Sequence, residues 1–490
     1  MSDAVAVVPV PLVVRPLPHE PFLIARSTVV VVDASEDVLP VGVLTADLLG
    51  RVTGRAVEVR EADLDAPGVV RLRLTADLPP GDEAYRVRVG SGRVELEGRT
   101  VDGLVHAVVT LRQLLREQDG TVSAAAVLVE DAPRYAWRGL TLDVARHFLP
   151  VADLKVVIGL MGHYKLNVLH LHLTDDQAWR IDLPSRPELV RRSSARSVGG
   201  DPGGSYSAAD WDEILAYARA RAVRVVPELD VPGHVNAALR AYPELVPGGE
   251  PPAEYLGTDV GFSRLHDTPA TRAFLADVFG DLAQMTPGEY LHVGGDEALT
   301  MGTGEYVRLV RAAAGAVTAH GKRVVGWQEV ASVPDLPAGT VLQYWDTRVD
   351  PEPFVAAARA GARILLSPAP RVYLDQQPVP GFPLGLSWAG HVELRDAYEW
   401  EPATLVDGLP ADAVVGVEAA LWTETLRTLD DVLTMLLPRL AAVAEVAWSD
   451  PGRRDLDDFL TRLGSHAELW DRLGLPWYRS PQGRWVPAPA

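Results

Sequence analysis

The apolar positions in the first 132 residues predict a small α+β domain. Leucine and valine recur at helical spacing between Leu104 and Leu115, which indicates one amphipathic helix. Gly90-Ser91-Gly92 separates two apolar runs and is typical of a hairpin turn. His, Asp, Glu and Trp form no cluster that suggests a site, so we expect this part to pack against the rest of the chain. Runs rich in β-branched residues are typical of strands, and they lie at residues 12–14, 28–32, 57–60, 69–74, 85–89 and 93–96.

The pattern changes near Pro133 to apolar runs separated by longer segments, many with helical spacing, as in βα units. Helices are expected at 153–164, 208–222, 271–284, 305–320 and 430–448. Eight strands are expected at 140–144, 168–173, 224–229, 290–293, 323–327, 341–344, 363–366 and 414–421. Parallel strands in this number, with intervening helices, close most naturally into a (β/α)8 TIM barrel. The sequence therefore predicts an α/β fold with a small α+β domain at 1–132 and a barrel, followed by a C-terminal helical segment, at 133–490.

Composition narrows the possible partners. The chain has 490 residues and 47% of them are hydrophobic, which is enough for a large core. With 46 basic and 66 acidic residues, its net charge of −20 gives no electrostatic reason to expect nucleic acid or an anionic membrane. The absence of cysteine excludes disulfides and thiolate metal sites. No run of about 18 apolar residues and no signal-peptide pattern occurs, so we expect no transmembrane span and favour a cytoplasmic location, with the compartment left open.

The predicted strand ends carry carboxylates, indole rings and an arginine, and TIM barrels place their active sites at the carboxyl ends of the strands. Flat rings stack on the C–H faces of a sugar while acids and arginine bind its hydroxyls, so the set predicts a carbohydrate pocket. Taken singly, each tryptophan could be packing and Arg146 could be a surface ion pair. The candidates are Arg146, Asp175, His234, Asp296, Glu297, Trp327, Trp345, Tyr373, Asp375, Trp388, Trp422 and Glu424.

The adjacent acids Asp296 and Glu297 follow an apolar strand and two glycines. Burial of acids at a strand end costs free energy, which favours a chemical role. Neighbouring side chains of a strand point to opposite faces, so the pair cannot easily flank a glycosidic bond as nucleophile and proton donor. We expect one acid to handle a proton and the other to orient a group. The alternative is a helix cap, because Ala298 could open a helix.

Two other functions compete with a glycosidase. His170 and His172 lie on one side of a strand and, with Asp175 and His234, could form the metal site of a metal-dependent amidohydrolase on a TIM barrel. The later strand ends carry tryptophans, however, and the two histidines precede their own strand end, which favours hydrogen-bonded core histidines. We therefore expect neither metal nor cofactor. A catalytically silent sugar-binding barrel would keep the tryptophans but lack a working acid.

Several motifs follow one another along the barrel region. They are Arg146-His147-Phe148, Leu169-His170-Leu171-His172-Leu173-Thr174-Asp175-Asp176-Gln177, Pro227-Glu228-Leu229-Asp230-Val231-Pro232-Gly233-His234, His292-Val293-Gly294-Gly295-Asp296-Glu297 and Leu421-Trp422-Thr423-Glu424. In this order they resemble glycoside hydrolase family 20, the β-N-acetylhexosaminidases, over about residues 135–480. The first part of the chain also resembles the small α+β domain that precedes the barrel in many members.

The resemblance implies an exo-acting retaining enzyme that removes terminal non-reducing GlcNAc or GalNAc from oligosaccharides or glycoconjugates. Its partner would be a carbohydrate with a terminal β-linked N-acetylhexosamine. In such enzymes the 2-acetamido oxygen of the substrate attacks the anomeric carbon and gives an oxazoline-type intermediate. Glu297 would protonate the leaving oxygen and later activate water. Asp296 would hold the acetamido N–H and stabilise the developing positive charge, and Tyr373 would hydrogen-bond the acetamido oxygen.

The same resemblance implies binding roles for the remaining candidates. Arg146 would bind the 3- and 4-hydroxyls, and Asp375 and Glu424 the 4- and 6-hydroxyls. Asp175 and His234 would give polar support to the acidic pair. Trp327, Trp345 and Trp422 would wall the pocket, with Trp388 as a further wall. The preference for GlcNAc or GalNAc, the linkage and the oligomeric state are left open.

Overall fold

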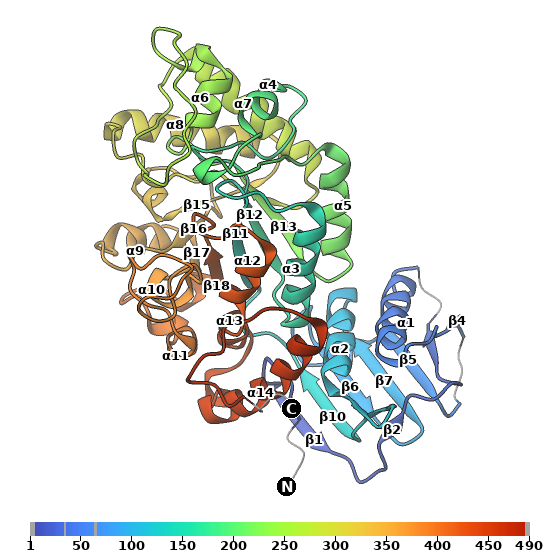
Figure 1. Ribbon diagram of the computed structural model, residues 1–490. Helices are drawn as coiled ribbons and strands as arrows, with labels where there is room; N and C mark the ends of the chain where they lie inside the picture. Colours follow the sequence, from blue (N-terminus) through green and yellow to red (C-terminus); the bar gives the residue numbers. More distant parts are fainter. Residues whose placement is uncertain (1–4, 34–35, 63–65, 486–490) are drawn as a thin grey trace.

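The computed structural model describes residues 5–33, 36–62 and 66–485, and its first part is the predicted α+β domain (Figure 1). The main sheet has the strand order β1-β10-β6-β7-β5-β3-β4. Antiparallel pairing of Val89 with Val94 confirms the predicted hairpin. The strands of this sheet are β1 Val13–Pro16, β3 Val29–Val32, β4 Val59–Glu61, β5 Val69–Leu74, β6 Tyr85–Val89, β7 Arg93–Gly98 and β10 Val127–Asp131.

Two helices, α1 Leu39–Thr53 and α2 Val101–Leu114, complete this domain. The Thr100 side chain accepts a hydrogen bond from the backbone N–H of Gly103 and so caps α2, which is the predicted amphipathic helix. The sequence pattern did not reveal β10 or a small second sheet of β2 Phe22–Leu23, β8 Leu115–Gln118 and β9 Thr121–Ala124. Strand β8 is mostly exposed and polar, so it carries no apolar alternation that would mark it.

The second part of the chain is a closed barrel of eight parallel strands in sequence order, as predicted. Four strands match the predicted residues at both ends, and the others differ by a few residues. The barrel strands are β11 Trp137–Asp143, β12 Val168–His172, β13 Arg224–Glu228, β14 Tyr290–His292, β15 Arg323–Trp327, β16 Val341–Tyr344, β17 Arg363–Leu366 and β18 Val414–Leu421.

Helices surround the barrel, and one prediction about them is wrong. The single helix expected at 430–448 is two helices, α12 Leu429–Leu436 and α13 Arg439–Trp448. Pro438 has no N–H to donate, and the residue before it is extended, so the first helix ends there. The other helices are α3 Val151–His163, α4 Glu188–Ser193, α5 Ala208–Arg219, α6 Asn236–Ala241, α7 Pro269–Met285, α8 Thr303–Ala319, α9 Glu352–Arg359, α10 Ala369–Val372, α11 Leu394–Tyr398 and α14 Leu456–Leu473.

The α+β domain packs against the barrel through buried contacts. Trp448 of α13 belongs to the hydrophobic core of the first domain, and its indole N–H donates to Asp131 at 3.0 Å. The guanidinium of Arg138 on β11 pairs with Glu83. Figure 1 shows this domain, in blue, beside the lower end of the barrel, away from α4 and α6 at the upper end. Among the residues with a described position, no helix combines the length and apolarity that a membrane crossing needs.

The inside of the barrel is polar toward the carboxyl ends of the strands, above an apolar layer that includes Val168 and Val226. His170 and His172 alternate with leucines along β12, so both imidazoles point inward. Glu228 from β13 and Glu418 from β18 are fully buried beside them and accept their N–H groups. A buried carboxylate needs such partners, so this layer forms a hydrogen-bonded floor under the strand ends.

Candidate active site

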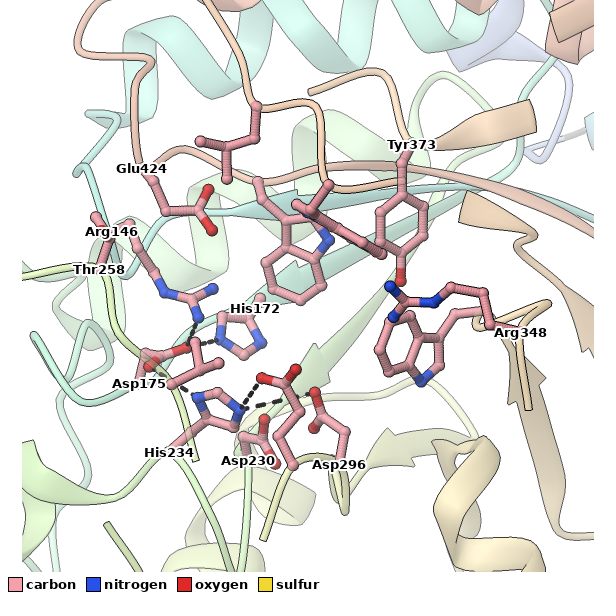
Figure 2. Close-up of a pocket in the computed structure, with 16 residues that line it drawn as sticks. Arg146, His172, Asp175, Asp230, His234, Thr258, Asp296, Arg348, Tyr373 and Glu424 are labelled. Carbon is pink, nitrogen blue, oxygen red and sulfur yellow. Dashed lines mark hydrogen bonds and ion pairs between the residues drawn. The ribbon is translucent and has the colours of Figure 1, made fainter. Parts of the chain in front are cut away.

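A pocket of about 210 Å3 opens at the carboxyl ends of the barrel strands (Figure 2). Its lining joins residues from strands or loops that are far apart in the sequence, as expected for this end of a TIM barrel. The predicted residues that line it are Arg146, Asp175, His234, Asp296, Glu297, Trp345, Tyr373, Trp388, Trp422 and Glu424. Lining residues outside the predicted set are His172, Asp230, Thr258, Val260, Arg348 and Leu386.

The acidic pair lies in a left-handed loop rather than in a strand. Strand β14 ends at His292, and Gly294 and Gly295 have φ values of 67° and 103°. A Cβ on Gly294 would lie 1.8 Å from Oδ1 of Asp230, so only glycine fits there. Glu297 itself has a φ of 44°. The expected strand-like opposition of the two acids is therefore wrong, because this backbone turns both carboxylates toward one wall.

His234 lies between the acidic pair and the floor of the pocket. Its Nε2 is 3.4 Å from Oε2 of Glu297 and 3.7 Å from Oδ2 of Asp296. Its Nδ1 donates to Oδ1 of Asp175 at 3.1 Å. Figure 2 shows His234 between Asp175 on one side and Asp296 on the other. The imidazole is 2% exposed, so these carboxylates, and not water, decide its orientation.

Electrostatics divide the carboxyls of the site into two kinds. Burial raises the pKa of Asp296, with a further increase from Glu297, and burial together with Asp296 raises the pKa of Asp230 well above its usual value. Burial would also raise the pKa of Asp175, but Arg146 and His234 hold it well below the usual value. The pocket thus contains carboxyls with raised pKa values beside one whose pKa is held low.

Aromatic rings form one side of the pocket. The rings of Trp345 and Tyr373 stack with centroids 6.3 Å apart, and Trp388 meets each of them edge-on at 5.8 Å. The indole N–H of Trp345 donates to Oε2 of Glu329 at 3.2 Å, which fixes the ring. Trp388 is 41% exposed and therefore reaches the mouth of the pocket.

Arg146 and Glu424 lie across the pocket from Tyr373 (Figure 2). The guanidinium of Arg146 pairs with Oδ2 of Asp175 at 2.7 Å and lies 5.1 Å from the ring centroid of Trp422. Although burial alone would lower it, the pKa of Arg146 is raised well above its usual value by Asp175 and other acids. Burial raises the pKa of Glu424 even though Arg146 opposes this. This end offers both a fixed cation and a carboxyl with a raised pKa.

Two predicted residues do not line the pocket. Trp327 is 1% exposed, donates from its indole N–H to Oε1 of Glu228 at 2.8 Å, and packs 5.9 Å from the ring of Trp422. Asp375 is buried behind the pocket, where burial and Glu424 raise its pKa to about 8. Its Oδ1 has no hydrogen-bond partner in the structure. Trp327 therefore stands directly behind a lining residue, Trp422.

Asp230 and Arg348 are the charged lining residues that the prediction left out, apart from His172. Asp230 lies two residues after the end of β13, and its Oδ1 accepts the backbone N–H of Gly295 at 3.0 Å, so its place near a strand end was the available signal. Arg348 pairs twice with Asp346, at 2.8 and 2.9 Å, and lies 5.2 Å from the ring of Trp388. No motif marks Arg348, since it lies in a loop and its contacts depend on the fold.

Some of these groups lie close enough for metal ligation. Within the described residues, their ligand atoms fall within 4.8 Å of one another in the sets His170, Glu228 and His292; His172, Glu228 and Asp230; Asp175, Asp176 and His234; and Asp230, His234 and Asp296. In the first two sets the histidine nitrogens facing Glu228 are at hydrogen-bonding or ion-pair distance from its carboxylate. Ionised carboxylates and imidazole N–H groups satisfy each other in this arrangement.

Comparisons with known proteins agree with one another. The family described as "Glycosyl hydrolase family 20, catalytic domain" matches residues 135–304 and 304–451, and "Glycosyl hydrolase family 20, domain 2" matches residues 4–132. A β-N-acetylhexosaminidase of Cellulomonas fimi is 60% identical over 483 residues, which are 98% of this chain and 97% of that protein.

Solved structures give the same result for the fold. The GH20 β-N-acetylhexosaminidase of Streptomyces coelicolor A3(2) is 43% identical, with a TM-score of 0.94 and 99% of each chain covered. The N-acetyl-β-hexosaminidase of Streptomyces plicatus in complex with Thio-NAglucal is 44% identical, with a TM-score of 0.95 over 99% of this chain and 98% of that one. The barrel and the domain before it are therefore shared with these proteins as one arrangement.

Proposed function

The chain belongs to glycosyl hydrolase family 20 and is an exo-acting β-N-acetylhexosaminidase, and from that premise we propose how its residues divide the reaction. Catalysis is substrate-assisted: the 2-acetamido oxygen attacks the anomeric carbon, the leaving oxygen departs with a proton, and water then opens the oxazoline-type intermediate with retention. The enzyme must therefore supply a proton donor and a group that holds the acetamido substituent, but no nucleophile of its own.

Asp296 and Glu297 perform these two tasks in our proposal. Glu297 gives its proton to the leaving oxygen and later takes one from water, and Asp296 accepts the acetamido N–H and stabilises the positive charge that develops there. The observation that carries the proposal is the left-handed loop, which turns two consecutive carboxylates to the same wall beside His234. Oδ1 of Asp296 is buried without a partner, as an acceptor for a substrate N–H requires.

Tyr373 and the tryptophans bind the acetamido group and the sugar ring. Burial, together with Asp375 and Asp296, raises the pKa of Tyr373 well above its usual value, so its hydroxyl keeps the proton that it donates to the acetamido oxygen. Trp345 and Trp422 face the cavity as apolar surfaces for the ring. Trp327 supports Trp422 from behind, and Trp388 covers the mouth of the pocket.

The non-reducing end of the sugar lies at Arg146, Glu424 and Asp375. Arg146 donates to the 3- and 4-hydroxyls, and the two carboxyls bind the 4- and 6-hydroxyls, with the unpartnered Oδ1 of Asp375 as one acceptor. Arginine and raised-pKa acids together match hydroxyls, which both donate and accept. The small cavity supports binding of one terminal β-linked N-acetylhexosamine as substrate. We also propose the division into a 1–132 domain and a 133–490 barrel domain.

Kinetics of acid variants test the assignment. Glu297→Gln should lower turnover of a chitobiose-type substrate by about 10²–10⁴-fold with binding nearly intact. Asp296→Asn should impair 2-acetamido sugars specifically. Glu305→Gln, which removes a carboxylate on α8 outside the pocket, is the control and should keep full activity. Near-normal turnover by Glu297→Gln would contradict the assignment of Glu297 as the proton donor.

Aryl β-GlcNAc and β-GalNAc hydrolysis, with and without EDTA, separates the remaining alternatives. A substrate-assisted glycosidase should be insensitive to the chelator and blocked by GlcNAc-thiazoline, which resembles the oxazoline-type intermediate. Loss of activity with EDTA would instead favour a metal-dependent hydrolase. A silent binding barrel would hydrolyse neither substrate.

A further inference from the structure

A line of alternating acidic and basic side chains runs through the inside of the barrel toward the acidic pair. His172 is the last residue of β12, and Glu228 is the last residue of β13 and its register partner. Nδ1 of His172 lies 2.5 Å from Oε2 of Glu228, and its Nε2 lies 2.8 Å from Oδ2 of Asp175. The exposed fractions of these side chains are 1% or less, so water does not interrupt the line.

Both ring nitrogens of His172 face a carboxylate oxygen. An ionised carboxylate only accepts hydrogen bonds, so both nitrogens must donate, and His172 is therefore an imidazolium. The pKa of His172 is consistent with this charge. Burial would lower it, but Glu228 and Asp175 raise it to about 10. Burial alone would raise the pKa of Glu228, yet His172, His292 and His170 hold it well below the usual value.

Asp175 connects this line to the acidic pair. Its Oδ2 accepts from His172 and pairs with Arg146, and its Oδ1 accepts from Nδ1 of His234. The other nitrogen of His234 faces Glu297 and Asp296. The rotamer of Asp175, which orients His234, is thus set in part by a charged donor beneath it. Figure 2 shows His172 beside Asp175, joined to it by a dashed line, with His234 below the two.

We propose that Glu228 and His172 are positioning residues of the glycosidase reaction, which act through Asp175 and His234 to hold the catalytic acid in place. The inference rests on the roles proposed above for Glu297 and Asp296 and adds two residues beneath them. Glu228 keeps His172 charged, charged His172 holds Asp175, and Asp175 fixes the ring of His234. Neither Glu228 nor His172 needs to touch the reacting atoms.

The charges that face His172 come from several elements. Glu228 approaches from β13, Asp230 from the loop after β13, Asp175 from the loop after β12, and Arg146, beyond Asp175, from the loop after β11. The ring of Trp422 contacts it edge-on at 4.9 Å and is neutral. Glu228 is in turn faced by His170, His292 and Trp327. Loss of the Glu228 charge therefore leaves His172 with one hydrogen-bonded carboxylate, Asp175, which it shares with Arg146, while Asp230 lies within 4.8 Å and has a pKa raised well above its usual value.

Glu418 offers a matched control for Glu228. Both carboxylates are 0% exposed in the barrel interior, both accept from His170, and both accept an indole N–H, Glu228 from Trp327 and Glu418 from Trp137. Only Glu228 also contacts His172. Glu228→Gln and Glu418→Gln thus remove the same buried charge from the same layer, with and without contact to the proposed line.

The test is the pH dependence of kcat and KM for aryl β-GlcNAc hydrolysis by the two variants. Without the Glu228 charge, His172 loses its proton nearer neutral pH, so kcat of Glu228→Gln should fall about tenfold at pH 8 while it stays near wild type at pH 5. KM should change less than about twofold. Glu418→Gln should keep the wild-type profile. Equal profiles in Glu228→Gln and wild type, or the same loss in both variants, would overturn the proposal.

A double-mutant cycle separates positioning from damage to the fold. With His172→Gln already present, Glu228→Gln should cause no further loss of kcat at pH 8, and additive losses would contradict action through His172. If Glu228→Gln does not fold, NMR of histidine ring nitrogens in the wild-type enzyme decides instead. His172 must then be doubly protonated from pH 5 to 8, and its titration below pH 7 would overturn the proposal. Normal turnover by Glu297→Gln would refute the roles proposed for the acidic pair. The protonation of His172 measured by NMR does not depend on that outcome, so the two failures can be told apart.

Discussion

Gly294→Ala is expected to unfold the loop that carries the acidic pair. The backbone at Gly294 has a φ of 67°, which costs an alanine about 1–2 kcal/mol. The added methyl would also meet Oδ1, Cγ and Cα of Asp230 at 1.8, 2.3 and 2.7 Å, so the chain after β13 must move. Such overpacking costs roughly 1–3 kcal/mol. The expected loss in the free energy of unfolding is therefore about 2–5 kcal/mol.

Substitutions at two other glycines separate the backbone cost of a positive φ from the cost of the steric clash. Gly339 has a φ of 77° but open space at its Cβ, so Gly339→Ala should lose only the backbone part, about 1–2 kcal/mol. Gly315 lies within α8 with open space and ordinary φ, so Gly315→Ala should gain roughly 0.5–1 kcal/mol. Denaturant unfolding measures all three.

Turnover provides the second measurement on the same series. Movement of Asp230 in Gly294→Ala also breaks its hydrogen bond to Gly295 and displaces Asp296 and Glu297. A misplacement of about 1 Å costs on the order of a hundredfold in rate. Gly339→Ala and Gly315→Ala should keep full kcat. The reasoning about the close approach would be refuted if Gly294→Ala unfolded no earlier than Gly339→Ala, or if it kept its kcat within about twofold.

Three further variants test other parts of the structure. Trp448→Ala should lose about 3–5 kcal/mol in denaturant unfolding because its buried ring fills the core of the first domain and bonds Asp131; a loss below about 1 kcal/mol would contradict that packing. Burial and Glu424 raise the pKa of Asp375 from 3.8 to about 8, so the folded state holds an extra proton between these values and stability falls as pH rises through them. Calorimetry from pH 5 to 8 should show a smaller fall for Asp375→Asn, and an unchanged slope would argue against the shift. Trp388→Ala, at the exposed mouth, should raise KM about three- to tenfold with an unchanged melting temperature; a large stability loss would instead make it a core residue.

Much of the barrel was predictable because its strands are buried on both faces. Runs such as Arg363–Leu366 and Val414–Leu421 are mostly apolar and buried, so the apolar run itself marks the extent of each strand. The exposed strand Leu115–Gln118 has no such pattern. The break at Pro438 was visible in the sequence, since proline cannot continue a helix, but the helical spacing on either side concealed it.

The site was predictable where chemistry coincides with a strand end, and less so elsewhere. Asp296 and Glu297 follow β14, and Trp422 follows β18, so a strand count suffices to bring them together. Their orientation was not predictable from strand alternation, because the left-handed backbone after His292 replaces the strand. Arg348 lies in the loop after β16, and only its contact with Trp388 places it at the pocket.

The distribution of imidazoles explains why one site of this acidic protein contains carboxyls with lowered pKa values beside carboxyls with raised ones. On the barrel side, Asp175 and Glu228 have pKa values held low despite burial, because imidazoles or Arg146 donate to them. On the pocket side, Asp230, Asp296 and Asp375 have raised pKa values, since burial is not compensated by enough cations. His234 lies between the two groups. Its Nδ1 faces Asp175, whose pKa is lowered, and its Nε2 faces Asp296, whose pKa is raised. The ionised floor can orient a base or an acid without exchanging protons, while the carboxyls above it can share protons with sugar hydroxyls and an acetamido group. The net charge of the chain is thus a poor guide to its site, where the placement of a few cations decides which acids hold protons.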